Sequence, residues 1–205
     1  MARTRTGEIS RRTKAKAATH EKILATAGKL MRTEGLAAAS VPRVMHGAGL
    51  TVGGFYAHFS SKRAMDAEVI RRASAKSHRG WPGAIQEKDG QKWLESAVKS
   101  YLSRSHRDDA AGGCVFPAIV AEVANSNKGT REATMGAFEN YVQAITAHAP
   151  ETRGITARER ALATFALCVG GIALARAFRG DGLSDELLSA CRKWALPESK
   201  RDERK

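Results

Sequence analysis

Apolar residues recur at spacings of three and four along most of this 205-residue sequence, and no stretch shows sustained alternation of apolar and polar residues. In residues 16–35, for example, Ile23, Leu24, Ala27 and Met31 fall on one face of a helix. Similar patterns cover residues 94–102, 114–124, 130–147, 156–178 and 183–196. The sequence therefore predicts an all-α protein of about nine helices.

Positive charge is concentrated at the N-terminal end of the chain. The net charge of the chain is +13. Residues 1–80 hold 16 basic and 5 acidic residues, whereas residues 81–205 hold 18 basic and 16 acidic residues. Such an asymmetry indicates that the N-terminal part faces a polyanion. Residues 1–15 are basic and without periodicity, which predicts a flexible arm that either contacts DNA or only solubilises the chain.

Composition argues against several other classes of protein. With 42% apolar residues the chain has enough material for a packed core. Its longest apolar run, residues 161–175, is shorter than the roughly 18–20 residues of a membrane span, and no apolar secretory segment follows the N-terminal arginines. The three cysteines are far apart, without the spacing of a metal site or a disulfide framework. We expect a cytoplasmic protein without metal, cofactor or membrane partner.

A loop-rich segment separates the basic part from the rest. Glycine and proline cluster between residues 80 and 90, and the last eight residues are densely charged. We therefore expect four parts: an arm at residues 1–15, a basic helical module at 16–80, a larger helical domain at 81–197 and a charged tail at 198–205.

Residues 40–59 have the pattern of a helix, a tight turn and a second helix. Gly49 supplies the backbone freedom that the turn needs, and Leu50 fills the angle between the helices. Phe55 and Phe59 lie four residues apart, so both can pack inward on the preceding helix. The second helix starts with little side-chain bulk, which suits close approach to a DNA major groove.

A resemblance to TetR-type transcriptional regulators lies in residues 51–65, TVGGFYAHFSSKRAM. A pair of small residues precedes an aromatic residue, Tyr56, one variable residue, His58 and Phe59, and a Ser/Lys start to the next helix follows. The preceding AGLT, residues 48–51, also matches the turn of that family. The resemblance covers about residues 18–78. It implies a three-helix DNA-binding domain, with its helix-turn-helix at about 41–60, followed by an effector-binding and dimerisation domain.

Eight residues are the predicted DNA contacts. Thr51 can offer its hydroxyl and nearby N–H groups to a phosphate, and Lys62 starts a helix whose dipole favours the same partner. The resemblance makes Tyr56 and His58 groove-edge residues, although His58 can instead pack against the next helix. Val52 offers only apolar contact, so hydrogen bonds to bases must come from the preceding helix or the arm. The set is Arg43, Thr51, Val52, Gly53, Gly54, Tyr56, His58 and Lys62.

The C-terminal part resembles the family more loosely, and two groups of residues are predicted there. Aromatic residues on several helices, together with Cys114, either line an apolar effector cavity or fill a core. The candidates are Trp81, Trp93, Tyr101, Cys114, Phe116, Phe138 and Tyr141. Two adjacent glycines inside a helix cost about 1 kcal/mol each relative to alanine, which close packing of another helix must offset. That helix belongs to a two-fold partner or to the same subunit. The predicted interface is Leu167, Gly170, Gly171, Leu174, Leu187 and Cys191.

Cys114 has two interpretations. At the N-terminus of a helix its thiol pKa would be lowered, which suits sensing of an oxidant or an electrophile. Alternatively, it is a small apolar residue at the start of a buried helix. No His or Lys activator is adjacent in the sequence, which favours the second interpretation.

These features predict a homodimeric repressor of a palindromic DNA operator. Two recognition helices, about 34–36 Å or a multiple apart, would read successive major grooves. By family resemblance, a small molecule in the C-terminal domain would shift the fourth helix and change the spacing of the two DNA-binding modules. The alternatives are a constitutive DNA-binding protein and an enzyme with Cys114 as nucleophile. The enzyme would lack an evident base, phosphate loop, dinucleotide motif or metal ligands.

Overall fold

The computed structural model describes residues 2–75, 90–149 and 154–196, which consist of helices and loops without a strand among them. The first helix, α1 (Ala2–Glu34), is 33 residues long. It begins at Ala2, not at residue 16 as the apolar pattern suggests. Alanine, arginine and lysine favour a helix even where no apolar face marks it. Gly35, with φ +96°, ends α1 as expected.

The helix-turn-helix consists of α2 (Val41–Gly47) and a short 3₁₀ helix, η1 (Val52–Ala57). Gly49 adopts φ +66° in the turn, as the sequence predicts. The predicted second helix is a 3₁₀ helix, because a glycine pair in a six-residue segment gives little support to α-helical hydrogen bonds. Ser40 and Thr51 hold the N-cap positions with extended backbones, but neither side chain makes a capping hydrogen bond. α3 (Lys62–Ala75) completes the basic module.

Six helices form the described C-terminal part. They are α4 (Gly90–Tyr101), α5 (Arg104–Asp108), α6 (Phe116–Val123), α7 (Lys128–Thr146), α8 (Ala157–Ala177) and α9 (Gly182–Ala195). The start of α8 is fixed by a capping box, in which Thr156 and Glu159 satisfy each other's backbone N–H groups. The five-residue helix α5 has no counterpart in the sequence analysis, because it is too short to show a period.

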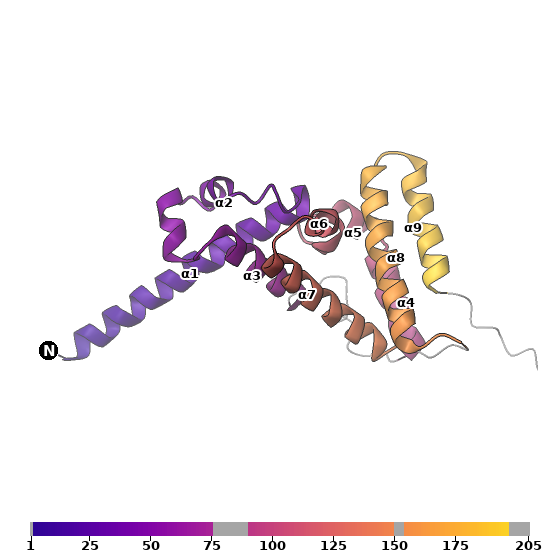
Figure 1. The fold of residues 1–205 in the computed structure, drawn as a ribbon, viewed down its shortest axis with the longest axis horizontal. Coiled ribbons are helices and arrows are strands. Elements are labelled where there is room, and N and C mark those ends of the chain that lie inside the picture. Colours follow the sequence, from indigo (N-terminus) through magenta and orange to yellow (C-terminus); the bar gives the residue numbers. More distant parts are fainter. Residues whose placement is uncertain (1, 76–89, 150–153, 197–205) are drawn as a thin grey trace, which may run out of the picture.

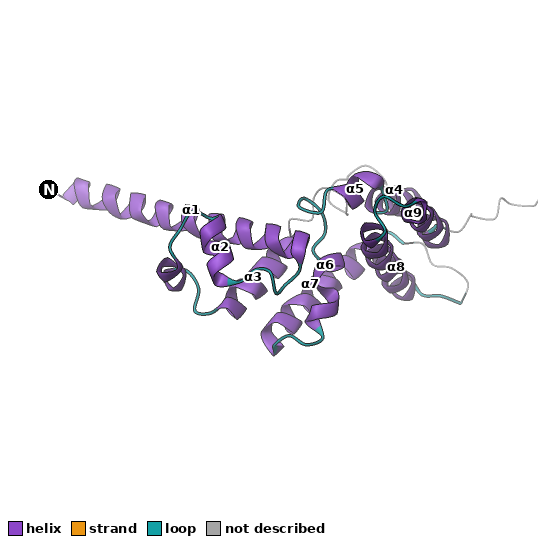
Figure 2. Ribbon diagram, turned by 90° about the horizontal axis from the view of Figure 1, so that it is seen from above, coloured by secondary structure: helices purple, strands orange, loops and turns teal. Residues whose placement is uncertain are grey.

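The molecule is elongated, with the basic module at one end and the α8–α9 hairpin at the other (Figure 1). α3 packs along α7, and this contact joins the two parts (Figure 1). α8 packs against both α7 and α9. The N-terminal half of α1 projects past the rest of the basic module in both views (Figures 1 and 2).

α8 is the long apolar helix of the C-terminal part. By length and composition alone it could span a membrane. In the fold it is a core helix: Ala161, Phe165, Cys168 and Ile172 are fully buried against the neighbouring helices. The apolar residues on this face of α8 are therefore accounted for by packing within the protein.

Gly171 shows how closely α8 and α9 approach. A Cβ atom at this position would lie 2.9 Å from both Cys191 Sγ and Leu102 Cδ2. We predict that Gly171→Ala lowers the free energy of unfolding by about 1–3 kcal/mol, because the added methyl overpacks this contact. Gly136→Ala on α7, where a Cβ would meet nothing within 4 Å, should instead raise it by up to about 1 kcal/mol. Urea unfolding of both variants checks this, and equal effects would contradict the packing.

Candidate nucleic-acid interface and effector region

The exposed side of η1 is the candidate DNA-reading surface. Phe55 is fully buried and Phe59 is 5% exposed, and their stacked rings lie 5.3 Å apart. With these two rings inside, Val52 and Tyr56 must face out, and they are 46% and 69% exposed. The Tyr56 ring meets Phe55 only edge-on, at 5.3 Å. The inward packing of both phenylalanines is therefore confirmed.

The glycine pair leaves this surface without bulk. A Cβ at Gly53 would meet no atom within 4 Å. At Gly54 it would lie 3.7 Å from Met45 Cε and 3.8 Å from Thr51 Oγ1, which is ordinary contact. Neither residue needs to be glycine for the packing of this chain. The small size of Gly53 thus leaves room for something outside the protein.

Thr51 borders the same surface, whereas Arg43 on α2 pairs with the end of α1. Thr51 is exposed at the N-cap of η1. The guanidinium of Arg43 donates from Nη2 to both carboxylate oxygens of Glu34, at 3.0 and 2.9 Å. Both partners are about half exposed, so the pair contributes little stability and can exchange for a phosphate at small cost.

Lys62 is engaged within the protein. Its Nζ donates to Asp66 Oδ2 at 2.7 Å, and the Asp66 side chain is only 5% exposed. The other carboxylate oxygen, Asp66 Oδ1, is buried without a hydrogen-bond partner. Burial raises the pKa of Asp66, and Lys62 opposes that shift by stabilising the charged form. Because Lys62 already serves as counter-ion to a buried carboxylate, contact with DNA phosphate would weaken that pair.

His58 packs inside the module instead of pointing freely outward. It is half-buried, its Nδ1 is buried without a hydrogen-bond partner, and its ring centre lies 5.9 Å from that of His20. Burial lowers the pKa of His58, and the positive charges of His20 and Lys16 lower it further. The structure thus favours the packing interpretation over the groove-edge one.

His20 is a residue that the sequence analysis missed. Its ring stacks on Phe59 with centres 4.5 Å apart, and its Nε2 lies 3.0 Å from Glu68 Oε1 on α3. It thereby links α1, η1 and α3. Its position three residues before Ile23, on the apolar face of α1, was the available signal.

The comparisons with known proteins agree with this geometry. The family described as bacterial regulatory proteins, tetR family, matches residues 23–69, which span the end of α1 through α3. The chain carries a TetR-family DNA-binding domain. No curated protein matches the sequence. The match covers the helix-turn-helix whose outward surface is described above.

Solved structures show that the likeness in fold extends beyond the DNA-binding domain over most of the chain. A TetR-family regulator from Agrobacterium tumefaciens has a TM-score of 0.73 at 18% identity, covering 88% of this chain and 97% of that one. The reduced form of E. coli NemR gives 0.70 at 20% identity, covering 85% and 95%. AibR, in complex with isovaleryl coenzyme A and operator DNA, gives 0.63 at 14% identity, covering 88% and 100%. At these identities the likeness shows the fold.

In the C-terminal part, five of the predicted effector residues meet around Phe165. Phe165 is fully buried, and its ring centre lies 4.7–6.5 Å from those of Tyr101, Phe116, Phe138 and Tyr141. The buried thiol of Cys114 belongs to the same region, because Tyr101 and Tyr141 both influence its pKa. The sequence analysis missed Phe165, which sits in the apolar run of α8 without a distinguishing mark.

The other two predicted effector residues are not part of this cluster as described. Trp93 is buried and stacks on His148, with ring centres 4.4 Å apart. Trp81 lies outside the described residues. The aromatic cluster therefore draws on α4, α6, α7 and α8.

The environment of Cys114 decides between its two interpretations. The residue is 7% exposed, and burial raises the pKa of its thiol, the opposite of what a thiolate sensor needs. Its backbone N–H donates to His106 Nε2 at 3.1 Å, so this imidazole is occupied by the backbone. The N-cap position of α6 belongs to Val115. The structure favours the buried apolar interpretation.

Two sets of contacts connect the C-terminal part to the DNA-binding domain, and the first involves α6 and the segment before it. On α6, the Glu122 carboxylate accepts hydrogen bonds from the backbone N–H groups of Leu36 and Ala37, at 2.7 and 2.8 Å. These residues form the loop between α1 and α2. In addition, the Arg32 side chain donates to the carbonyl of Ala111. The C-terminal part thus touches the loop that precedes the helix-turn-helix.

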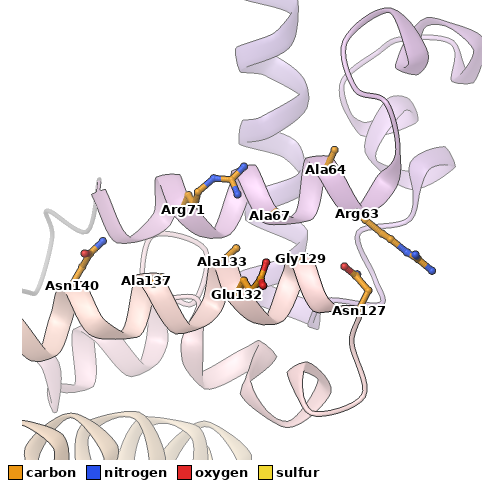
Figure 3. A pocket seen from close by; sticks show the side chains of 11 residues that line it. Arg63, Ala64, Ala67, Arg71, Asn127, Gly129, Glu132, Ala133, Ala137 and Asn140 are labelled. Atoms are coloured by element: carbon orange, nitrogen blue, oxygen red, sulfur yellow. The ribbon is translucent and has the colours of Figure 1, made fainter.

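α3 and α7 form the second connection, and their interface consists largely of small residues. Ala67, Ala133 and Ala137 are buried between the two helices. A groove of about 680 Å³ runs along this contact, with Arg63 and Arg71 on the α3 side (Figure 3). Helices that meet through such small side chains can slide past each other with little repacking.

The predicted dimer residues separate into two groups. Gly171 and Cys191 contact each other inside the chain, so we remove them from the predicted interface. A Cβ at Gly170 would meet nothing within 4 Å, and Leu174 is 48% exposed. Leu167 and Leu187 are half-buried. Further exposed apolar residues on or beside the hairpin are Phe178, Leu183 and Trp194, which the sequence analysis did not select.

The Lys62–Asp66 pair predicts a pH-dependent loss of stability in Lys62→Met. In the folded protein the carboxyl pKa of Asp66 lies above its unfolded value, so its ionisation costs stability as the pH rises. Without Lys62 that cost should increase, by roughly 1–3 kcal/mol near pH 7, and should vanish below about pH 4, where Asp66 is protonated. Unfolding between pH 3.5 and 7.5 measures it. Lys99→Met, which breaks an exposed i,i+4 pair with Glu95, is the control and should change little at any pH.

The cysteines offer a second prediction. Ellman's reagent should react with Cys114 and Cys168 of the folded protein at least about 100-fold more slowly than with the unfolded chain, because both thiols are buried and burial raises their pKa values. Comparison of the wild type with Cys114→Ser identifies the signal of Cys114. Rapid native labelling that disappears in Cys114→Ser would restore the sensor interpretation.

Proposed function

We propose that the chain is a homodimeric repressor that binds a palindromic operator and is released by a small molecule bound in its C-terminal domain. The observation that carries this proposal is the surface of η1. It is exposed, lacks bulk at Gly53, and belongs to a module with 16 basic and 5 acidic residues in the first 80. A glycine there costs helix stability and is not required by the packing around it. Close approach to a major groove accounts for both facts.

The α8–α9 hairpin supports two-fold assembly. Leu174, Leu183 and Trp194 are 48%, 44% and 82% exposed, and Gly170 opens the surface between such side chains. Leu183, Leu187 and Trp194 recur on one face of α9 at helical spacing. An exposed apolar surface on two antiparallel helices fits an identical surface across a two-fold axis, forming a four-helix bundle.

The aromatic cluster supports an amphipathic effector. Its rings supply apolar surface, while the hydroxyls of Tyr101 and Tyr141 and the thiol of Cys114 supply polar groups in a buried setting. An effector that wedges among these rings would press on α6 and α7. α7 carries α3, and α6 holds the α1–α2 loop through Glu122. AibR, with its coenzyme A ester and operator DNA, shows that a protein of this fold can host both kinds of ligand.

The alternative is a constitutive DNA-binding protein, and Phe165 gives it one argument because it fills the centre of the cluster. Selection of bound sequences from random duplexes by the full chain, repeated with candidate small molecules, separates the two. We expect a palindromic consensus whose affinity falls when an effector is added. Failure to select any sequence would contradict DNA reading, and affinity that no compound changes would support the constitutive form.

We predict that Gly53→Gln leaves stability unchanged and lowers operator affinity. A side chain at this position meets no protein atom, so the free energy of unfolding should change by less than about 0.5 kcal/mol. In the complex the same side chain would enter the groove, and we expect affinity to fall at least about tenfold. Gly136→Gln, at another open glycine, is the control and should bind like the wild type. Unchanged binding by Gly53→Gln would move the reading surface elsewhere.

Dimerisation has its own test. Leu174→Glu combined with Trp194→Glu should yield a monomer in sedimentation velocity, because two charges would be buried per subunit in the interface. Affinity for a palindromic duplex should fall towards that for a half-site. Met135→Glu, at another exposed apolar residue, on α7, should remain a dimer. A double variant that still sediments as a dimer would place the interface on another surface.

A further inference from the structure

The N-terminal half of α1 is a projecting basic helix that the family match, residues 23–69, does not include. Residues 2–16 hold six arginines and lysines and one glutamate. The side chains of residues 11–18 are all exposed, whereas from His20 onward α1 packs on η1 and α3. Both views show this half of the helix extending beyond the basic module (Figures 1 and 2).

The projecting helix leaves the module beside η1. The His20 ring is 4.5 Å from Phe59 and 5.9 Å from His58, at the C-terminal end of η1. Lys16, one turn earlier, is close enough for its charge to lower the pKa of His58. The 18 residues before His20 extend about 27 Å at 1.5 Å per residue, the length of about eight base pairs.

A helix has different access to DNA from a flexible arm. An α-helix is about 10–12 Å wide with its side chains, whereas the minor groove is about 6 Å wide. An extended arm can read bases in that groove, but a helix cannot enter it. A basic helix beside the duplex can reach phosphate oxygens, which carry no direct sequence information.

We propose that residues 2–16 form a helical phosphate clamp, which holds the DNA backbone next to the groove read by η1 and adds affinity without adding sequence preference. This inference rests on the proposed DNA-binding function. An anionic membrane is the other polyanion to consider, but residues 2–18 contain a single large apolar residue, Ile9, and a surface-bound helix needs an apolar face.

Repulsion between like charges makes the stability of the projecting helix depend on bound DNA. Arg12 and Lys16 are four residues apart and Arg11 and Lys14 three, so neighbouring side chains on the helix repel each other. Phosphates that neutralise these charges remove the repulsion. Hydrogen exchange of residues 2–16 should therefore slow when the protein binds duplex DNA, whereas an arm that unfolds into the minor groove would exchange faster.

The main test replaces Arg11, Arg12, Lys14 and Lys16 together by Gln in the full chain. Operator affinity should fall at least about tenfold, and the slope of log Kd against log salt should fall by about three to four units, at about 0.9 per phosphate. The selected consensus should stay the same. The matched control replaces four exposed charges of the C-terminal part by Gln, at Lys99, Lys128, Arg131 and Arg179, and should keep the wild-type slope within about one unit.

A second variant tests the helix with its charges intact. Ala15→Pro removes a backbone hydrogen bond inside the projecting half, before the packed part of α1 begins. It should weaken binding at least about threefold and leave thermal unfolding of the module unchanged. Ala2→Pro, at the first position of α1, where proline is tolerated, should bind like the wild type.

The outcomes separate this inference from the function on which it rests. If the wild type selects no duplex, DNA binding fails and the clamp fails with it. If the wild type binds its operator but the quadruple Gln variant has the same affinity and salt slope, the clamp alone is refuted. A changed consensus in that variant would show base reading by an arm. If the quadruple Gln variant lost binding to vesicles of phosphatidylglycerol and phosphatidylcholine but kept the wild-type DNA affinity, the projecting helix would bind an anionic membrane instead.

Discussion

The burial of Phe55 and Phe59 is the interaction on which the DNA-binding surface depends. Both rings sit under η1, and Phe59 stacks on His20 of α1. Burial of two such side chains supplies several kcal/mol, far more than a six-residue 3₁₀ helix containing two glycines could contribute by itself. The position of η1 is thus fixed by the burial of Phe55 and Phe59. The side chains of Val52 and Tyr56 remain exposed on the opposite side of η1, and Gly53 places no side chain there.

The same module is connected to the rest of the chain by contacts of two kinds. The Glu122 carboxylate accepts hydrogen bonds from two backbone N–H groups of the α1–α2 loop, which fixes the position of the loop relative to α6. The α3–α7 contact instead includes small apolar side chains, those of Ala67, Ala133 and Ala137. A directional hydrogen-bonded contact thus lies beside a contact made by small apolar side chains.

Sequence reasoning succeeded where a residue pattern has a direct local cause. The helix period placed most of the C-terminal helices, the inward phenylalanines follow from their spacing of four, and the turn glycine follows from its backbone freedom. It could not foresee partners that come from distant parts of the chain. Lys62 matched a phosphate-binding position, yet its ammonium lies on Asp66 in a buried pair. Gly171 matched an interface glycine, yet it faces Cys191 and Leu102 of its own chain.

The sequence by itself determined that this chain is helical, that it carries a TetR-type helix-turn-helix, and that its basic end is the N-terminal one. These properties depend on local spacing and on composition, which a linear reading contains. Only the tertiary structure decided that the thiol of Cys114 is buried, that Phe165 organises the aromatic cluster, and that α1 continues as a helix to Ala2. Burial depends on which distant helices meet, and a solvated helix has no apolar face to mark its extent in the sequence.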